Sequence, residues 1–283
     1  MTTLASWAGV DSGIASIYIV SDSKLTAFRS DTRQIAGTVT NEAQKIFSCE
    51  SEAHIFGYAG WESYPVASLE LLISLIDSHD FFSYSDGLDT RQAKVQAFLK
   101  DKLRLSKSSR AAPSPFGILH AARRGKGKRS QFALWSLEWS PNKGWKIKKE
   151  RIRKKSAMLF SDGTGKWALR SRNRAWTRKI GATSRGVFSA FCQSLSKGID
   201  PQSGGAPQLA GLFRNFGAQY FGVVYQKACY YKGKRVLPTN APSETIWFNE
   251  RFELFDPIAM KRRPGAQPQP SPWRKRRKKR RLP

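Results

Sequence analysis

The second residue of the chain is a threonine, and a threonine directly after a methionine can do chemistry at a chain terminus. An initiator methionine is generally removed when the next side chain is small, so we expect Met1 to be absent and Thr2 to carry a free α-amine. The reference pKa of an α-amine lies close to neutral pH, so the amine can accept the proton of its own hydroxyl. Threonine is also a common second residue, so the position becomes informative only with suitable partners.

Three other positions are suited to support such a nucleophile. Lys45 begins an expected strand, and an ammonium there would lower the pKa of the Thr2 amine by like-charge repulsion. Asp22 ends another expected strand and could hold that lysine in orientation. Gly60 closes a run of small residues before an expected helix, where backbone N–H groups can reach an oxyanion. Taken singly, these residues also fit a turn aspartate, a surface lysine and a turn glycine.

Apolar periodicity predicts the elements that would position these residues. Strands are expected at 3–9, 15–22, 43–48, 53–58, 115–123, 130–139, 144–149, 156–160, 219–226, 228–236 and 244–249. Helices are expected at 62–78, 89–106, 164–173 and 184–197, with a short one at 206–215. Simple βαβ alternation is absent from this order, and two packed sheets with helices outside would bury every apolar face.

Several of these segments resemble proteasome β-subunits and the bacterial HslV-type protease, which are N-terminal-nucleophile hydrolases. The matching segments are Met1-Thr2-Thr3, Ser21-Asp22-Ser23, Lys45-Ile46, Gly57-Tyr58-Ala59-Gly60 and Asp200-Pro201-Gln202-Ser203-Gly204-Gly205. The resemblance is close over about residues 2–62 and returns near 156–168 and 184–205. It implies an α+β fold, a four-layer αββα sandwich over residues 2–256. Residues 257–283, rich in Pro, Gln and basic residues, are expected to form a disordered polybasic tail.

The resemblance also implies a role for each matching residue. Thr2 Oγ would attack a carbonyl to form an acyl-enzyme, Lys45 would tune the amine and Asp22 would pair with Lys45. The Gly60 N–H would stabilise the oxyanion, and Asp200 and Ser203 would bond near the Thr2 amine. The family's other supporting serine lies in a Gly-Ser-Gly turn, whereas this chain has Phe160-Ser161-Asp162-Gly163-Thr164-Gly165, which leaves Ser161 and Thr164 as alternatives.

The composition limits the classes of protein that the chain can belong to. No stretch approaches the roughly 20 apolar residues of a membrane helix, and no signal peptide is apparent, so a cytoplasmic protein is expected. Cys49, Cys192 and Cys229 are scattered, without a disulfide or zinc pattern. The three histidines show no metal spacing, and we expect no metal or cofactor.

The net charge of +28 points to anionic partners, or to a solvated basic surface with a basic tail. Basic runs at 123–129, 146–155 and 170–179, with the wholly basic segment 274–281, could contact phosphates. The first hypothesis is therefore a threonine-type amide or peptide hydrolase, expected by the resemblance to form a homo-oligomer such as a ring. An ATPase or unfoldase partner stays open. The alternatives are a nucleic-acid-associated protein on an inactive scaffold and a hydrolase of small amides.

Overall fold

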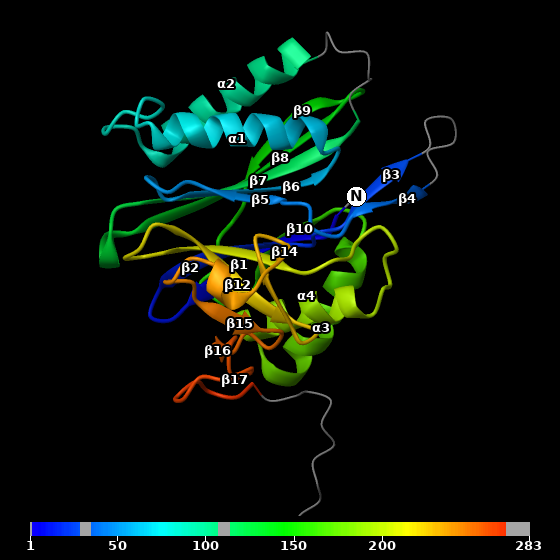
Figure 1. The fold of residues 1–283 in the computed structure, drawn as a ribbon. Coiled ribbons are helices and arrows are strands. Elements are labelled where there is room, and N and C mark those ends of the chain that lie inside the picture. The colour runs from blue at the N-terminus through cyan, green and yellow to red at the C-terminus, as the bar shows by residue number, and fades with distance from the viewer. Residues whose placement is uncertain (1, 29–34, 107–113, 270–283) are drawn as a thin grey trace, which may run out of the picture.

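The computed structural model describes residues 2–28, 35–106 and 114–269, and most of their strands belong to two sheets (Figure 1). The larger sheet has the spatial order β10 (Met158–Asp162), β1 (Leu4–Val10), β2 (Ile14–Ser21), β11 (Gln208–Phe213), β12 (Ala218–Tyr225), β13 (Ala228–Tyr231) and β14 (Lys234–Arg235), with β15 (Trp247–Asn249) paired to β12. The smaller sheet is antiparallel, in the order β5 (Ile46–Ser48), β6 (His54–Gly60), β7 (Phe116–Arg124), β8 (Gln131–Ser140) and β9 (Gly144–Lys149).

The two sheets face each other across an apolar core. Ile17 and Ile19 of β2 enter this core together with Ile55 of β6 and Leu119 of β7. Val20, adjacent to Ile19, packs on the opposite side of the larger sheet. Side chains alternate along a strand, so β2 can bury both of its faces only because each face has its own partner.

Two pairs of helices cover the outer faces of the sheets (Figure 1). Helices α1 (Ser63–Asp77) and α2 (Leu88–Ser106) pack on the smaller sheet through a cluster that includes Leu69, Leu72 and Leu99. Helices α3 (Lys166–Ile180) and α4 (Ser184–Ser196) pack on the larger sheet through residues such as Phe188 and Phe191. The prediction of a fold that mixes helices and sheets is confirmed, and sheets dominate it.

The helix expected at 206–215 is wrong, because the chain there forms β11, which lies between β2 and β12. Leu209 packs toward α3 and α4, whereas Leu212 packs between the sheets. Periodicity cannot distinguish such a short apolar run from a buried helix. The structure also contains a hairpin of β3 (Leu25–Phe28) and β4 (Ile35–Thr40) that the sequence did not predict.

The chain continues beyond residue 256 as part of the fold. Strand β16 (Phe255–Asp256) pairs with β17 (Lys261–Arg262), and the Gln269 N–H donates to the Glu253 carboxylate. The basic segment 274–281 lies outside the described residues. Within the described ranges, no helix is both long and apolar enough to cross a membrane.

Two buried histidines lie between the smaller sheet and α2. His54 Nδ1 is 2.9 Å from His120 Nε2, and His120 Nδ1 is 2.5 Å from Gln92 Oε1. Burial lowers the pKa of His54 and brings that of His120 down to about 3. Both rings are therefore neutral parts of the core in the folded protein.

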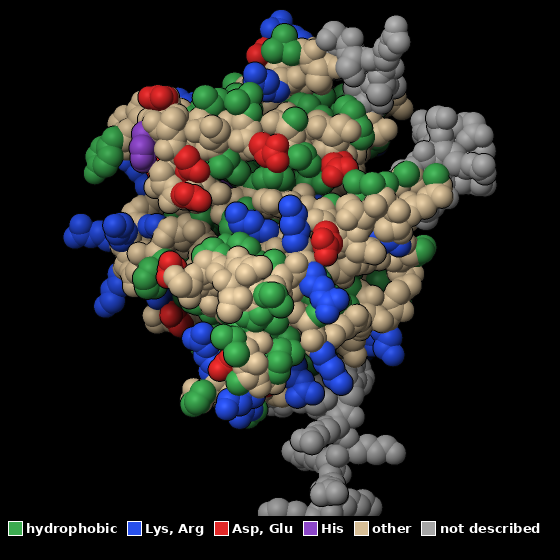
Figure 2. All heavy atoms as spheres, in the orientation of Figure 1, with side chains coloured by type: hydrophobic (Ala, Val, Ile, Leu, Met, Phe, Trp, Pro, Cys, Tyr) green, Lys and Arg blue, Asp and Glu red, His purple; other side chains and the backbone are tan. Residues whose placement is uncertain are grey.

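Charge is unevenly spread over the face of the molecule in Figure 2. Acidic side chains lie mainly in the upper half, where α1 and α2 are found, and Lys and Arg gather in the lower half. On this face, the positive charge is therefore concentrated in the lower half.

Candidate active site

The β1–β2 hairpin brings the start of the chain beside Asp22. The two strands are antiparallel, with Leu4 opposite Ser21, so the residues before Leu4 lie next to the residue after Ser21. The Asp22 N–H donates to the Thr3 carbonyl at 3.2 Å, which extends the ladder by one bond. Strand β5 of the facing sheet begins just after Lys45, which brings this lysine to the same place.

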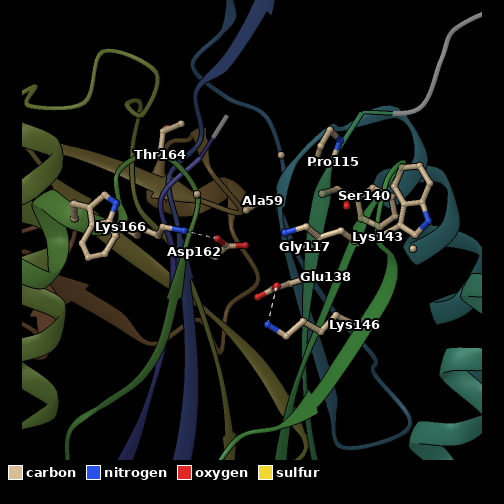
Figure 3. A pocket seen from close by; sticks show the side chains of 16 residues that line it. Ala59, Pro115, Gly117, Glu138, Ser140, Lys143, Lys146, Asp162, Thr164 and Lys166 are labelled. Carbon is tan, nitrogen blue, oxygen red and sulfur yellow. Dashed lines mark ion pairs between the residues drawn. The ribbon is translucent and has the colours of Figure 1, made fainter.

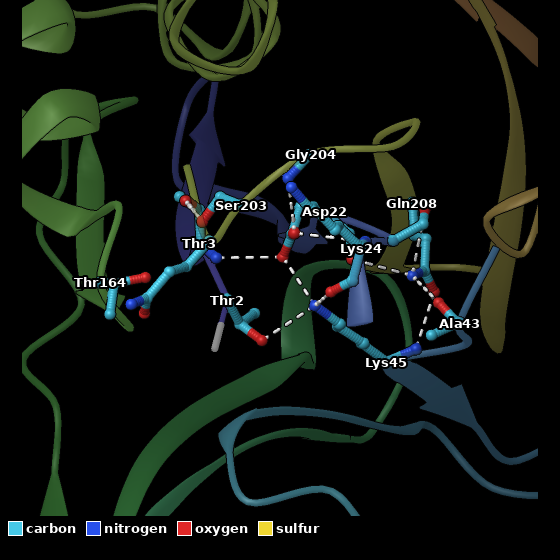
Figure 4. Close-up of polar contacts among 12 residues, drawn as sticks. Thr2, Thr3, Asp22, Lys24, Ala43, Lys45, Thr164, Ser203, Gly204 and Gln208 are labelled. Atoms are coloured by element: carbon cyan, nitrogen blue, oxygen red, sulfur yellow. Dashed lines mark hydrogen bonds and ion pairs between the residues drawn. The ribbon is translucent and has the colours of Figure 1, made fainter. Parts of the chain in front are cut away.

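Lys45 links Thr2 to Asp22 inside the protein (Figure 4). Its Nζ donates to Thr2 Oγ1 at 2.9 Å, to Asp22 Oδ1 at 3.0 Å and to the Lys24 carbonyl at 2.5 Å. Thr2 and Lys45 are each 1% exposed and Asp22 is 0% exposed. A buried ammonium costs several kcal/mol to desolvate, and here a carboxylate and two further oxygens offset that cost.

Each oxygen of the Asp22 carboxylate accepts two hydrogen bonds, and one of the donors to Oδ1 is Lys45 Nζ. Oδ1 also accepts from the Thr3 N–H at 3.0 Å, and Oδ2 accepts from the N–H groups of Gly204 at 2.9 Å and Lys24 at 3.3 Å. These bonds fix the carboxylate in one orientation, so the position of Lys45 is fixed with it.

Gln208 of β11 holds the two chain segments that carry Asp22 and Lys45. Its Nε2 donates to the carbonyls of Asp22 at 3.0 Å and Ala43 at 2.7 Å, and its Oε1 accepts from the Lys45 N–H at 2.9 Å. Gln208 was not among the site residues expected from the sequence, because it lies in the segment expected to be helical.

Asp200 and Ser203 lie in the same site, but their bonds run to Thr3. Thr3 Oγ1 donates to Ser203 Oγ at 2.7 Å, and Ser203 Oγ donates to Asp200 Oδ2 at 2.6 Å. These bonds end on the residue next to Thr2, and the expected contact to a free Thr2 amine stays a prediction. Thr164 Oγ1 also donates to Asp200 Oδ2, at 2.6 Å.

Thr164 rather than Ser161 joins this network. The Ser161 hydroxyl instead accepts a hydrogen bond from Arg170 Nε at 2.7 Å. The turn that carries Thr164 passes directly against the chain start: a Cβ on Gly163 would lie 1.8 Å from the Thr2 carbonyl oxygen, and one on Gly165 1.8 Å from Thr3 Oγ1. Two glycines around Thr164 are therefore required by this close approach.

Gly60 lies at the end of β6, on the wall of a cavity of about 560 Å³ (Figure 3). Its φ is +98°, and a Cβ there would lie 2.5 Å from the Pro115 carbonyl oxygen. The cavity has aromatic walls of Phe116, Trp139 and Trp167, and the turn that touches Thr2 forms another wall through Gly163.

Two ionisable side chains on the β6 side of the site are influenced by burial. Burial raises the pKa of the Tyr58 phenol, and the nearby Glu62 and Asp22 carboxylates add to this shift. Burial also raises the pKa of the Glu62 carboxyl, whereas the charge of Lys45 acts in the opposite direction. Lys45 therefore acts electrostatically on Glu62 as well as contacting Thr2.

Comparison with known proteins gives a distant structural likeness and no family. No protein-family model matches the chain, and no curated protein matches it. The chain is similar to the Anbu (ancestral beta-subunit) structure from Yersinia bercovieri, with 11% identity over 77% of this chain and 86% of that one, at a TM-score of 0.46. It is also similar to an Anbu (Gly-1) mutant from Hyphomicrobium sp. strain MC1, with 9% identity, 82% and 87% coverage and a TM-score of 0.47.

These findings contradict the prediction that the chain is a member of the proteasome β-subunit and HslV-like family. The similar structures are Anbu proteins, the identities do not exceed 11%, and both TM-scores lie below 0.5. The motifs that suggested the family are short, and their order alone does not establish descent. A likeness this distant assigns no activity to the chain.

Proposed function

We propose that the protein is an amide hydrolase whose nucleophile is Thr2, with its α-amine freed by removal of Met1. The observation that carries the proposal is the buried Lys45 ammonium, 2.9 Å from Thr2 Oγ1 and 3.0 Å from Asp22 Oδ1. A fixed cation beside a hydroxyl stabilises negative charge as it develops on the oxygen. The two facing sheets and their outer helices correspond, in this proposal, to a four-layer αββα sandwich.

The reaction would run through two acyl transfers. The free Thr2 amine takes the proton of Oγ1, and Oγ1 attacks the substrate carbonyl carbon. The tetrahedral species collapses as the amine returns the proton to the leaving nitrogen, which breaks the amide bond and leaves an ester on Thr2. Water, deprotonated by the same amine, then hydrolyses the ester. Lys45 favours the neutral, basic form of the amine by like-charge repulsion.

The remaining residues would position the reacting groups. Asp22 orients Lys45, and the Gly60 N–H would donate to the oxyanion. Asp200 and Ser203 act through Thr3, because their hydrogen bonds fix the residue that follows the nucleophile. They are positioning residues in this proposal, and Thr164 belongs with them.

The cavity beside the site supports a peptide as substrate over a small amide. Its volume of about 560 Å³ and its aromatic walls would accommodate a large side chain next to the scissile bond. A small amide would leave most of this apolar surface in contact with water.

The proposal is tested by the state of the N-terminus and by substitution of Thr2. Intact mass measurement should find Met1 absent, and Thr2→Ala should lower hydrolysis of a fluorogenic peptide library by about 10³-fold or more. Thr2→Ser should retain measurable activity, because it keeps the hydroxyl and the amine. Thr3→Ser is the matched control, since it keeps the bond to Ser203 and should retain most activity. Active protein that keeps Met1 would refute the proposal.

A further inference from the structure

Basic residues are concentrated in one part of the chain that the proposed chemistry does not use. Between Lys143 and Lys179 there are fourteen Lys and Arg residues but only two acidic ones, whereas the whole chain has 49 and 21. This segment forms β9, β10 and α3. β9 and β10 are the terminal strands of the two main sheets, so the basic segment includes one edge of each sheet.

Three cavities follow one another along these edges, and each shares lining residues with the next. The first, about 250 Å³, is lined by Arg170, Arg174 and β10 residues, and it shares Phe160 and Arg170 with the second, about 240 Å³. The second shares Glu138 and Lys146 with the large cavity beside Thr2. We call this chain of cavities the basic groove. It runs along β10 and β9 and ends at the wall that contains Gly60 and Gly163.

The acidic residues of the basic groove are already paired. Glu138 is 3.9 Å from Lys146, Glu150 is 2.7 Å from Lys148, and Asp162 is 3.6 Å from Lys166. The other charged side chains that line it are all cationic: Lys143, Arg170 and Arg174. A ligand in the groove therefore meets a net positive field from one end to the other.

The two sheet edges beside the groove favour an extended polypeptide. Edge strands carry backbone groups that can pair with an added extended chain. A nucleic acid would instead stack its bases on exposed aromatic rings, and the exposed ring beside the groove is Trp167, at 64% exposure. The Arg170 guanidinium already lies over the Trp167 ring, 5.1 Å from its centre. The positive charge of the groove and the sheet edges beside it together fit an extended polypeptide with clustered carboxylates.

We propose that the basic groove binds acidic polypeptide segments and presents the adjoining peptide bond to Thr2. The presentation step rests on the proposed hydrolase function, whereas binding in the groove does not. The carboxylates of the segment would lie near Arg174 and Arg170 at one end and near Lys143 at the other. Exposed charges act over a Debye length of about 10 Å at 0.1 M salt, so binding should weaken as salt rises.

The binding test uses Thr2→Ala protein, which cannot consume its ligand by the proposed route. Fluorescence anisotropy would compare a glutamate-rich peptide, a lysine-rich peptide of equal length and a single-stranded oligonucleotide. We expect the acidic peptide to bind, and Lys143→Glu with Arg174→Glu to weaken its binding about tenfold at low salt. The matched control is Lys100→Glu with Arg129→Glu, an equal charge change at exposed sites outside the groove, which should alter binding less than twofold.

Three results would overturn the inference: equal weakening by both double variants, no preference for the acidic peptide, or tighter binding of the oligonucleotide than of the acidic peptide. Far-ultraviolet circular dichroism would confirm that both variants remain folded. In protein with Thr2 intact, the ratio of kcat/KM for acidic over neutral peptides should fall about tenfold in the groove variant. Charge-selective binding without any Thr2-dependent hydrolysis would refute the hydrolase proposal and leave the acidic binding site standing.

Discussion

Replacing Asp22 by asparagine would leave the Lys45 ammonium buried without a counter-charge. The lysine would keep its contacts to Thr2 Oγ1 and the Lys24 carbonyl, but at 1% exposure it cannot turn to water. Removing one member of a buried ion pair typically costs about 3–5 kcal/mol. At about 2–4 °C per kcal/mol for a chain of this size, the melting temperature should fall by roughly 6–20 °C.

A double-mutant cycle separates the pair from its surroundings. Lys45→Met should also cost about 3–5 kcal/mol, because it leaves the Asp22 carboxylate buried without its cation. The combined variant buries no unpaired charge, so it should be more stable than the sum of the single effects predicts, by about 2 kcal/mol or more.

Urea unfolding followed by tryptophan fluorescence measures all three variants. Asp101→Asn is the control, because its ion pair with Arg104 is exposed and should be worth less than about 1 kcal/mol. The reasoning fails if Asp22→Asn costs no more than this control, or if the two single effects simply add.

Two further predictions concern the turn beside Thr2 and the buried histidines. Gly163→Ala should abolish hydrolysis and destabilise the fold, because its Cβ would lie on the Thr2 carbonyl oxygen. Gly181 has a similar positive φ but open space around it, so Gly181→Ala should show only the backbone cost of about 1–3 kcal/mol. Equal effects of the two substitutions would refute this reasoning. Unfolded histidines bind protons below about pH 6.5, whereas burial lowers the pKa of both His54 and His120, so stability should fall as the pH falls below about 6.5. With its pKa at about 3, His120 alone should lose about 2 kcal/mol of stability at pH 5. His120→Asn removes one of these groups, so the number of protons taken up on unfolding at pH 5 should fall by about one. This number follows from the slope of the unfolding free energy, measured with urea, against pH. An unchanged slope would contradict a neutral, buried His120.

The residues nearest to Thr2 could be predicted from the sequence because local structure brings them together. A hairpin of two strands places Thr2 beside Asp22. Lys45 directly precedes a strand, so packing of that strand's sheet on the hairpin is enough to bring Lys45 to the same place. Their catalytic roles remain predictions. The sequence also indicated the four main helices, because an apolar pattern with helical spacing over many residues is not compatible with a strand.

The contacts of Thr3 and Gln208 could not be predicted in the same way. Each depends on a segment about 160 to 200 residues away in the chain, and nothing local distinguishes their side chains from other polar ones. The strand that carries Gln208 was predicted to be helical because a six-residue apolar run buried on both faces has no clear period. Long-range pairing, rather than local preference, decides such positions.

The hydrogen bonds of Gln208 have a consequence for the order in which the protein matures. Asp22 and Lys45 are synthesised well before the side chain that ties their segments together, which follows 163 residues after Lys45. Strand β11 must insert between β2 and β12 before this tie exists, and such a non-local pairing forms slowly. In the proposed hydrolase, Asp22 and Lys45 would therefore stay without their common anchor until most of the chain has been synthesised, so the site would be completed late in folding.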